Sequence, residues 1–336
     1  MFSGTTFIGT FGPLSPWVLL ALFIASSLLL IWRLEHMTEI GVEGTVLGTL
    51  VMPYCSGISN LVFVFVVYAN DQPATEVMTN CLVNNVTNMT LIIGLPTIFW
   101  GMNLLPKAGV RVKTSRKNNK QEQANRINRL SLLLTLTAVL FFTGAAWALG
   151  RDGNLNRSDG LVLVGLFLFW QCFHIFEVMK ANVRQNKSLN WMLVVDFVLL
   201  LVGAYGTYLS IDGLVAWISN IHTGFISAKY LGWLSGWLMV LPNGLLALYY
   251  GWQGHPEVVY TSQVGDGHIC IPLCVGLYAL MTDMKVPPFF EIGVLILVGA
   301  TLIHFLFVAL FGQLPRFMGW ILTGAYGVFL YKGLFD

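Results

Sequence analysis

Long runs without a charged residue constrain this chain more than any other feature. No Asp, Glu, Lys or Arg occurs within Met1–Trp32, Gly44–Asn70 or Ile292–Pro315. Each run is long enough for the roughly 20 residues of a membrane-spanning helix. Of the 336 residues, 56% are hydrophobic and only 10% are charged, and the mean hydropathy is +0.72, outside the range of soluble domains. The sequence therefore predicts an integral membrane protein.

Ten spans fit the hydropathy of the chain. They are Trp17–Trp32, Val46–Ala69, Val77–Leu105, Leu130–Leu149, Leu161–Met179, Trp191–Leu209, Leu231–Tyr250, Val264–Met281, Phe290–Phe311 and Met318–Leu334. With the N-terminus outside, thirteen of the eighteen Lys and Arg residues lie on the inner side of the membrane. The five outside are Arg151, Arg157, Lys229, Lys285 and Lys332. Because basic residues concentrate in cytoplasmic loops, we expect a multi-pass protein of the cell membrane with both termini outside. The first span lacks a basic leader and a small-residue cleavage site, so it is expected to be a span and not a signal peptide.

A basic stretch at 106–129 follows the third span. It is polar and compatible with a helix, and we expect a cytoplasmic loop that contacts anionic lipid and no nucleic acid. Residues 1–182 contain five spans and residues 183–336 contain the other five. An odd number of spans in each half makes the second half enter the membrane from the opposite side. The expected fold is therefore an all-α polytopic membrane protein, with ten transmembrane helices in two inverted-topology five-helix repeats.

Polar residues inside the spans support this division. Each half has an Asn after a break in the apolar pattern, Asn60 in the first and Asn243 after Pro242 in the second. A polar cluster and an apolar run ending in Gly-Leu follow in both halves. Polar groups in hydrocarbon are tolerated where they face a cavity, and breaks in a helix release carbonyl oxygens that can bind a dehydrated cation. We expect two interrupted hairpins to bring five side chains together: Asn60, Asn84, Asn88, Asn243 and Asp266.

At these residues the chain resembles the cation/calcium exchanger superfamily. Its two repeats have the pattern G-T-S-x-P-E followed by G-N-x-x-G-S-N-x-x-N or D. Asn60 and Asn243 stand where the two glutamates belong, and Asp266 stands at the serine of the second G-S-N. The resemblance covers nearly the whole chain with low motif identity, and it implies a secondary antiporter. The ion-binding residues that it implies are Ser56, Asn60, Asn84, Asn85, Asn88, Asn243, Ser262 and Asp266.

The departures from this pattern concern the charge of the site. Calcium prefers six to eight oxygens that include carboxylates, whereas both glutamate positions here carry amides. Asp266, Asn60, Asn243 and Asn84 are the expected metal ligands, with Asp266 as the acidic one. We expect a monovalent cation or a proton to be carried in preference to tightly bound calcium. The alternative is a transport-inactive or repurposed scaffold that acts as a sensor, a binding protein or a carrier of another small solute.

Signatures of enzymes do not occur in this sequence. It contains no P-loop, no dinucleotide-binding G-x-G-x-x-G, no H-E-x-x-H and no G-x-S-x-G. We expect no enzymatic activity and no cofactor apart from the transported cation, such as Na⁺, H⁺ or Ca²⁺. The expected partners are membrane lipid and inorganic cations. Asp196, in the sixth span, is expected to partner a neighbouring helix. Glu291 and His304, in the ninth span, lie outside the two repeat motifs and are not expected to take part directly in transport.

Overall fold

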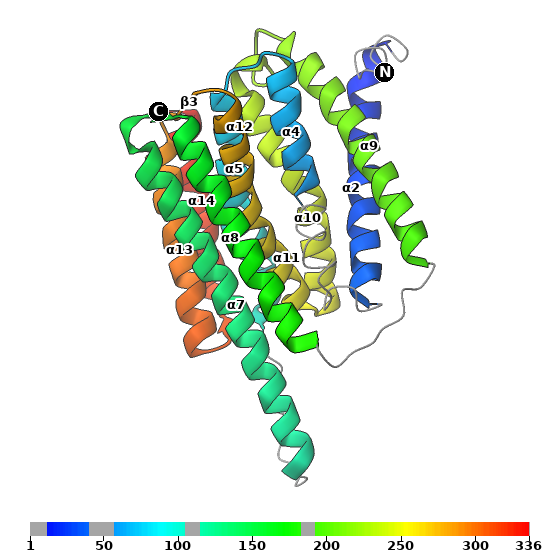
Figure 1. The fold of residues 1–336 in the computed structure, drawn as a ribbon, viewed down its shortest axis with the longest axis vertical. Coiled ribbons are helices and arrows are strands. Elements are labelled where there is room, and N and C mark those ends of the chain that lie inside the picture. The colour runs from blue at the N-terminus through cyan, green and yellow to red at the C-terminus, as the bar shows by residue number, and fades with distance from the viewer. Residues whose placement is uncertain (1–11, 40–56, 105–114, 183–191, 336) are drawn as a thin grey trace. The chain divides into compact units, whose positions relative to one another are not determined.

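The computed structural model describes residues 12–39, 57–104, 115–182 and 192–335, and the chain there is almost entirely helical (Figure 1). The first half contains α2 (Ser15–Glu39), α4 (Ile58–Ala69), α5 (Thr75–Thr87), the π-helical segment η2 (Asn88–Ile92), α6 (Ile93–Trp100), α7 (Ser115–Leu149) and α8 (Arg157–Asn182). The second contains α9 (Met192–Ser219), α10 (Leu231–Gln253), α11 (Pro256–Ile269), the π-helical segment η5 (Cys270–Val275), α12 (Gly276–Met281), α13 (Phe290–Leu310) and α14 (Arg316–Leu334). Three single turns are η1 (Gly12–Leu14), η3 (Gly150–Asp152) and η4 (Ala228–Tyr230). Four short strands are β1 (Met102–Asn103), β2 (Asn154–Leu155), β3 (Met284–Lys285) and β4 (Gln313–Leu314).

These helices form a multi-pass membrane fold. Within the described segments, seven helices are long and apolar enough to cross a bilayer: Ser15–Leu34, Thr75–Trp100, Arg129–Asp152, Val194–Ser219, Ala228–Gln253, Pro256–Met281 and Phe290–Leu310. Large apolar side chains such as Phe169, Leu295 and Trp320 are exposed, as lipid-facing residues are. With α4, α8 and α14, and with each π-containing run counted as one span, the described helices make the ten spans that the sequence predicts.

Packing divides the chain into two compact units. The first comprises Met1–Cys81, Asp152–Pro242 and Ile269–Pro287, and the second comprises Leu82–Arg151, Asn243–His268 and Pro288–Asp336. Each unit therefore draws on both halves of the sequence. The predicted boundary between the two five-helix repeats, after residue 182, divides the chain by the orientation of its spans and not by their packing, and it stays a prediction.

Two short antiparallel ladders relate the halves of the sequence. β1 pairs with β4 and β2 pairs with β3, and in each ladder a buried Met lies opposite a buried Leu: Met102 opposite Leu314, and Met284 opposite Leu155. The two Met residues are 182 positions apart and the two Leu residues 159. The difference of 23 equals the length of the basic stretch Lys107–Arg129, which the second half lacks. The ladders are thus equivalent, and in each of them one half of the sequence pairs with the other.

Glycines at two helix crossings show the same pairing of one half of the sequence with the other. A Cβ atom on Gly319 of α14 would lie 2.7 Å from the carbonyl oxygen of Gly94 on α6. A Cβ atom on Gly160 of α8 would lie 2.8 Å from the carbonyl oxygen of Gly276 on α12. Small residues let helix backbones approach this closely in membranes. The spacings of 182 and 159 positions recur here, so each half again supplies the surface on which the other packs.

Helices α2 and α9 lie side by side in the first unit (Figure 1). Gly203 and Gly206 of α9 face α2, where added Cβ atoms would meet Leu30 and Ser26. The close approach rests on the missing side chains at these two glycines. The two spans are therefore packed as a tight antiparallel pair.

Several helix boundaries differ from the predicted ones. α11 begins at Pro256 and not at Val264, because proline at the first helical position starts a helix well. α7 begins at Ser115, so part of the predicted basic loop continues the fourth span as helix. α10 runs through Pro242 without the expected interruption. Of the predicted second span, residues 46–56 lie outside the described segments.

Candidate ion-binding site

The central part of the third span is buried on all sides. Every residue from Val77 to Thr90 is buried, including the amides Asn84, Asn85 and Asn88. Asn88 Nδ2 donates a hydrogen bond of 3.1 Å to Asn84 Oδ1, and Asn85 Nδ2 donates one of 2.9 Å to the carbonyl oxygen of Gly267 on α11. In the second unit, the structure thus brings together two of the predicted ligands and ties a third to the eighth span.

The π-helical segments fall at equivalent places in the third and eighth spans. η2 begins at Asn88 and η5 begins at Cys270, which are again 182 positions apart. A π-helical turn disturbs the regular pairing of backbone groups and often marks a functional site. In η2 the carbonyl oxygen of Met89 lies 2.8 Å from Nε2 of His304 on α13. The expected helix interruption therefore takes the form of a change in helical pitch and not of a break.

Buried polar atoms near η2 lack partners. Within the described part of the chain, Oδ1 of Asn85 and Oδ1 of Asn88 accept no hydrogen bond. An unpaired buried carbonyl oxygen costs about 1–3 kcal/mol unless water or an ion satisfies it. These two amide oxygens are therefore available to a bound cation or to water.

The remaining predicted ligands are placed as follows. Asn60 is buried on α4 in the first unit, and Asn243 is half-buried on α10 in the second. Ser262 is exposed on α11 and accepts a hydrogen bond of 3.3 Å from Gln263. Asp266 lies on the same helix, but its side chain is outside the described atoms, and Ser56 is outside the described residues. Whether these residues share one site with Asn84 and Asn88 stays a prediction.

Polar residues recur at every fourth position along the third span. They are Glu76, Asn80 and Asn84 on α5 and Asn88 in η2, and residues four apart are neighbours on a helix surface. Asn80 Nδ2 donates to Ser235 Oγ on α10 at 3.0 Å, and Glu76 accepts a bond of 2.5 Å from the backbone N–H of Gly232 at the start of α10. The spacing of four was the sequence signal for Glu76, which motif matching missed.

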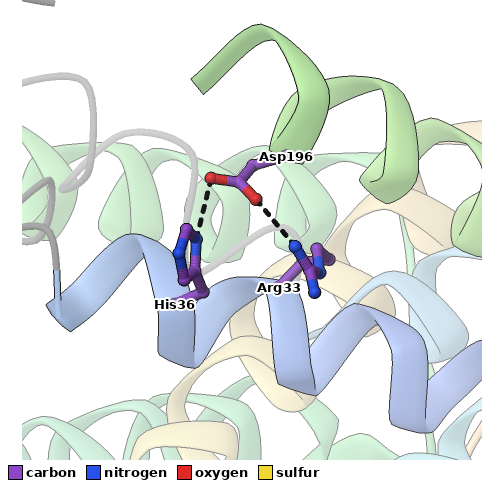
Figure 2. Close-up of polar contacts among 3 residues, drawn as sticks. All are labelled: Arg33, His36 and Asp196. Atoms are coloured by element: carbon purple, nitrogen blue, oxygen red, sulfur yellow. Dashed lines mark hydrogen bonds and ion pairs between the residues drawn. The ribbon is translucent and has the colours of Figure 1, made fainter. Parts of the chain in front are cut away.

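Asp196 contacts two basic side chains from α2, and Figure 2 shows both pointing at its carboxylate. Arg33 Nη1 lies 3.1 Å from Oδ1 of Asp196, and His36 Nδ1 lies 3.0 Å from Oδ2. Asp196 is buried, and Arg33 nearly so. The expectation that Asp196 partners a neighbouring helix is confirmed. The ion pair links the last turns of α2 to the first turns of α9.

A metal site built from acidic, sulfur or imidazole ligands is not present in the parts of the structure that are described. No three His, Cys, Asp or Glu residues there lie close enough to hold a metal ion. The polar groups gathered around η2 are instead amides, a hydroxyl and an imidazole, from Asn85, Asn88, Tyr260 and His304.

Solved structures of a sodium-calcium exchanger share this fold. The chain superposes on NCX_Mj soaked with 10 mM Na⁺ and zero Ca²⁺ with a TM-score of 0.65 at 18% identity, covering 98% of each chain. For NCX_Mj soaked with 10 mM Na⁺ and 10 mM Sr²⁺ the TM-score is 0.63 at 18% identity, with 99% of each chain covered. At this level of identity the likeness establishes the fold alone. No curated protein sequence matches the chain.

A family model covers most of the sequence. The model described as "Sodium/calcium exchanger protein" matches residues 14–176 and 195–333, which cover all or most of each of the ten spans. The gap between the two matched segments, residues 177–194, falls around the connection between the fifth and sixth spans, where the sequence divides into five spans and five. The ten-span fold is consistent with this match, and so is the packing of each half of the sequence against the other. The chain belongs to the sodium/calcium exchanger protein family.

Proposed function

We propose that this protein is a secondary-active cation antiporter that works by alternating access and carries a monovalent cation or a proton in preference to calcium. The observation that supports this most directly is the buried amide pair Asn84 and Asn88 beside η2. A span that only supported the bundle would be more stable with small or apolar residues at these positions. Unpaired amide oxygens on Asn85 and Asn88 are suited to replace part of the water around a cation.

The preference for low charge follows from electrostatics. At an effective dielectric constant of about 20, one carboxylate about 3 Å from a divalent ion contributes on the order of 10 kcal/mol of gross attraction. Amides at Asn60 and Asn243 lack that attraction, although the lower desolvation cost offsets part of the loss. A site of amides with Asp266 as its acidic member is therefore matched to a charge of +1.

The proposed orientation in the membrane follows from the basic residues. We infer that both termini face the outside of the cell, because this places the stretch Lys107–Arg129 in the cytoplasm. The tightly packed pair α2 and α9 is the element that would slide during alternating access. Their ion pair at Asp196 favours movement of the two helices as one piece.

The proposal is tested by ion flux in proteoliposomes that contain the purified protein. Sodium, potassium, proton, calcium and magnesium gradients are applied in turn, and we expect sodium or proton gradients to drive cation exchange while calcium exchange is at least about tenfold slower. Asn88→Ala and Asp266→Asn should each lower the flux at least about tenfold. Thr97→Val is the matched control, because Thr97 is buried on the same span and its hydroxyl donates a local hydrogen bond of 2.7 Å to the carbonyl oxygen of Ile93. A flat response to every gradient would reject transport and favour the repurposed scaffold.

A second variant tests the role of the amides in selectivity. Asn60→Glu combined with Asn243→Glu adds two carboxylates, and we expect calcium exchange to rise at least about tenfold relative to sodium exchange. The matched control is Asn60→Gln with Asn243→Gln, which adds the same length without charge. Equal calcium flux in the two double variants would show that charge at these positions does not set the selectivity.

A further inference from the structure

His304 is an intramembrane imidazole that the amide site does not use. It is fully buried on α13, and its Nε2 lies 2.8 Å from the carbonyl oxygen of Met89 in η2. A carbonyl oxygen only accepts hydrogen bonds, so Nε2 carries the hydrogen and donates it. In the neutral ring, Nδ1 is then the atom with the free lone pair.

The imidazole of His304 packs against the ring of Tyr260, and each ring has a polar atom without a partner. The ring of Tyr260 on α11 stands edge to face with the imidazole, with the ring centroids 5.5 Å apart and the planes at 71°. Both side chains are fully buried, and over the described atoms neither Nδ1 of His304 nor the hydroxyl of Tyr260 forms a hydrogen bond. Two buried rings in contact thus carry a basic lone pair and a hydroxyl group that are both unpaired, which is rare unless water or a proton is bound there.

This place adjoins the proposed cation site through η2. Met89, which accepts the imidazole N–H, is the residue after Asn88. Asn85 and Asn88 present their unpaired amide oxygens from the same run of chain. A charge on His304 is therefore only one peptide unit removed from a proposed ligand, inside a region of low dielectric where like charges repel strongly.

We propose that Nδ1 of His304 binds the proton that this antiporter exchanges for its cation, an inference that rests on the proposed function. Binding converts the neutral imidazole into an imidazolium with a hydrogen on both nitrogens, while the bond to Met89 is kept. On one side of the membrane an O–H bond of hydronium breaks to leave water as the N–H bond forms, and on the other side the N–H bond breaks as water takes the proton. Since a cation at Asn88 and an imidazolium at His304 disfavour each other, the two occupy the protein in turn.

Other ionisable groups lie on α13 and on the elements around it, and their charges contribute to the electrostatic potential at His304. Nε of Arg129 on α7 donates to the carbonyl oxygen of Val308, one turn along α13 from His304, at 2.9 Å. On α14, Tyr326 accepts a bond of 3.4 Å from Thr87. The other ionisable residues are Arg316, Tyr331 and Lys332 on α14, Glu291 on α13 itself, Glu76 and Cys81 on α5, and Glu257 on α11. On α7 they are Arg116, Lys117, Lys120, Glu122 and Arg126, with side chains outside the described atoms. Asp266 and His268 also lie on α11, with side chains outside the described atoms.

The test uses the full-length protein in liposomes, with radioactive sodium and an internal pH dye as probes. For the wild-type protein we expect an outward sodium gradient to drive proton uptake, and the apparent sodium affinity to fall by about tenfold per pH unit on the acid side, as competition of one proton with one cation requires. His304→Gln keeps an N–H donor for Met89 but cannot take up a proton. We expect it to lose sodium-driven proton movement at least about tenfold and to show sodium affinity that changes less than about twofold from pH 5.5 to 8.5.

Sodium self-exchange at pH 8.5 separates coupling from folding and from transport. His304→Gln should retain self-exchange within about twofold of the wild-type rate, since the site itself is intact. Tyr260→Phe removes only the neighbouring hydroxyl and should slow proton movement at least about threefold, so the idea stays testable if His304→Gln does not fold. Thr301→Val is the control, because Thr301 is buried one turn away on α13 and bonds to the carbonyl oxygen of Leu297. Intact self-exchange with undiminished proton coupling in both variants would overturn the role of His304 alone, whereas no sodium exchange in the wild-type protein would overturn the proposed function as well.

Discussion

Replacing Asp196 by alanine should lower the free energy of unfolding by about 3–5 kcal/mol, because it leaves Arg33 nearly buried beside α9 without its carboxylate partner. His36 loses the same partner. Attraction and desolvation nearly cancel in an intact buried pair, but removal of one member leaves only the desolvation cost. Denaturation in mixed micelles, followed by Trp fluorescence, measures the loss.

The matched control for Asp196→Ala removes both charges at once. Arg33→Met combined with Asp196→Leu fills the space with apolar atoms, and we expect a free energy of unfolding within about 1 kcal/mol of the wild-type value or above it. The contrast between the single and the double variant identifies the uncompensated charge as the cause. If the double variant lost as much stability as Asp196→Ala, packing and not charge would explain the effect.

Replacing Gly319 by valine should cost at least about 3 kcal/mol and abolish well-folded protein. Its Cβ atom would lie 2.7 Å from the carbonyl oxygen of Gly94 and 2.8 Å from the backbone nitrogen of Ile98. Backbone atoms cannot rotate away as a side chain can, so α14 and α6 would have to separate. The yield of monodisperse protein in size-exclusion chromatography and the thermal unfolding midpoint give the readout.

The fold supplies both an equivalent position and controls for Gly319→Val. Gly160→Val should fail in the same way, since its Cβ atom would lie 2.8 Å from backbone atoms of both Gly276 and Leu280. Gly324→Val on α14 and Gly165→Val on α8 place the same side chain on the same helices, where nothing lies within 4 Å of the Cβ atom, and should change stability by less than about 1 kcal/mol. Normal yields of Gly319→Val and Gly160→Val would contradict the close crossings.

The helices were predictable because each one leaves a long apolar run in the sequence. Their ends were less so, as α7 shows: the polar residues from Ser115 onward have good helix propensity, and nothing in a hydropathy pattern marks the point where a helix leaves the bilayer but continues. The ladders were not predicted, since strands of two residues have no periodicity to detect.

The amides of the site were predictable, but their partners were not. Asn84, Asn85 and Asn88 stand out as polar residues in a span, which hydropathy and motif spacing both reveal. His304 is 215 positions from Met89, and Gly267 is 182 positions from Asn85, so their contacts depend on how distant helices pack. The π-helical pitch of η2 likewise depends on backbone register, which the side-chain pattern does not encode.

The exchanged ladders bear on how such a molecule could have begun. A lone five-helix half would leave its Met strand and its crossing glycine without the surfaces they pack on, because those surfaces belong to the other half. The smallest self-sufficient ancestor is then a dimer of two identical chains inserted in opposite orientations. Joining two copies of its gene would have fused a dimer that already existed.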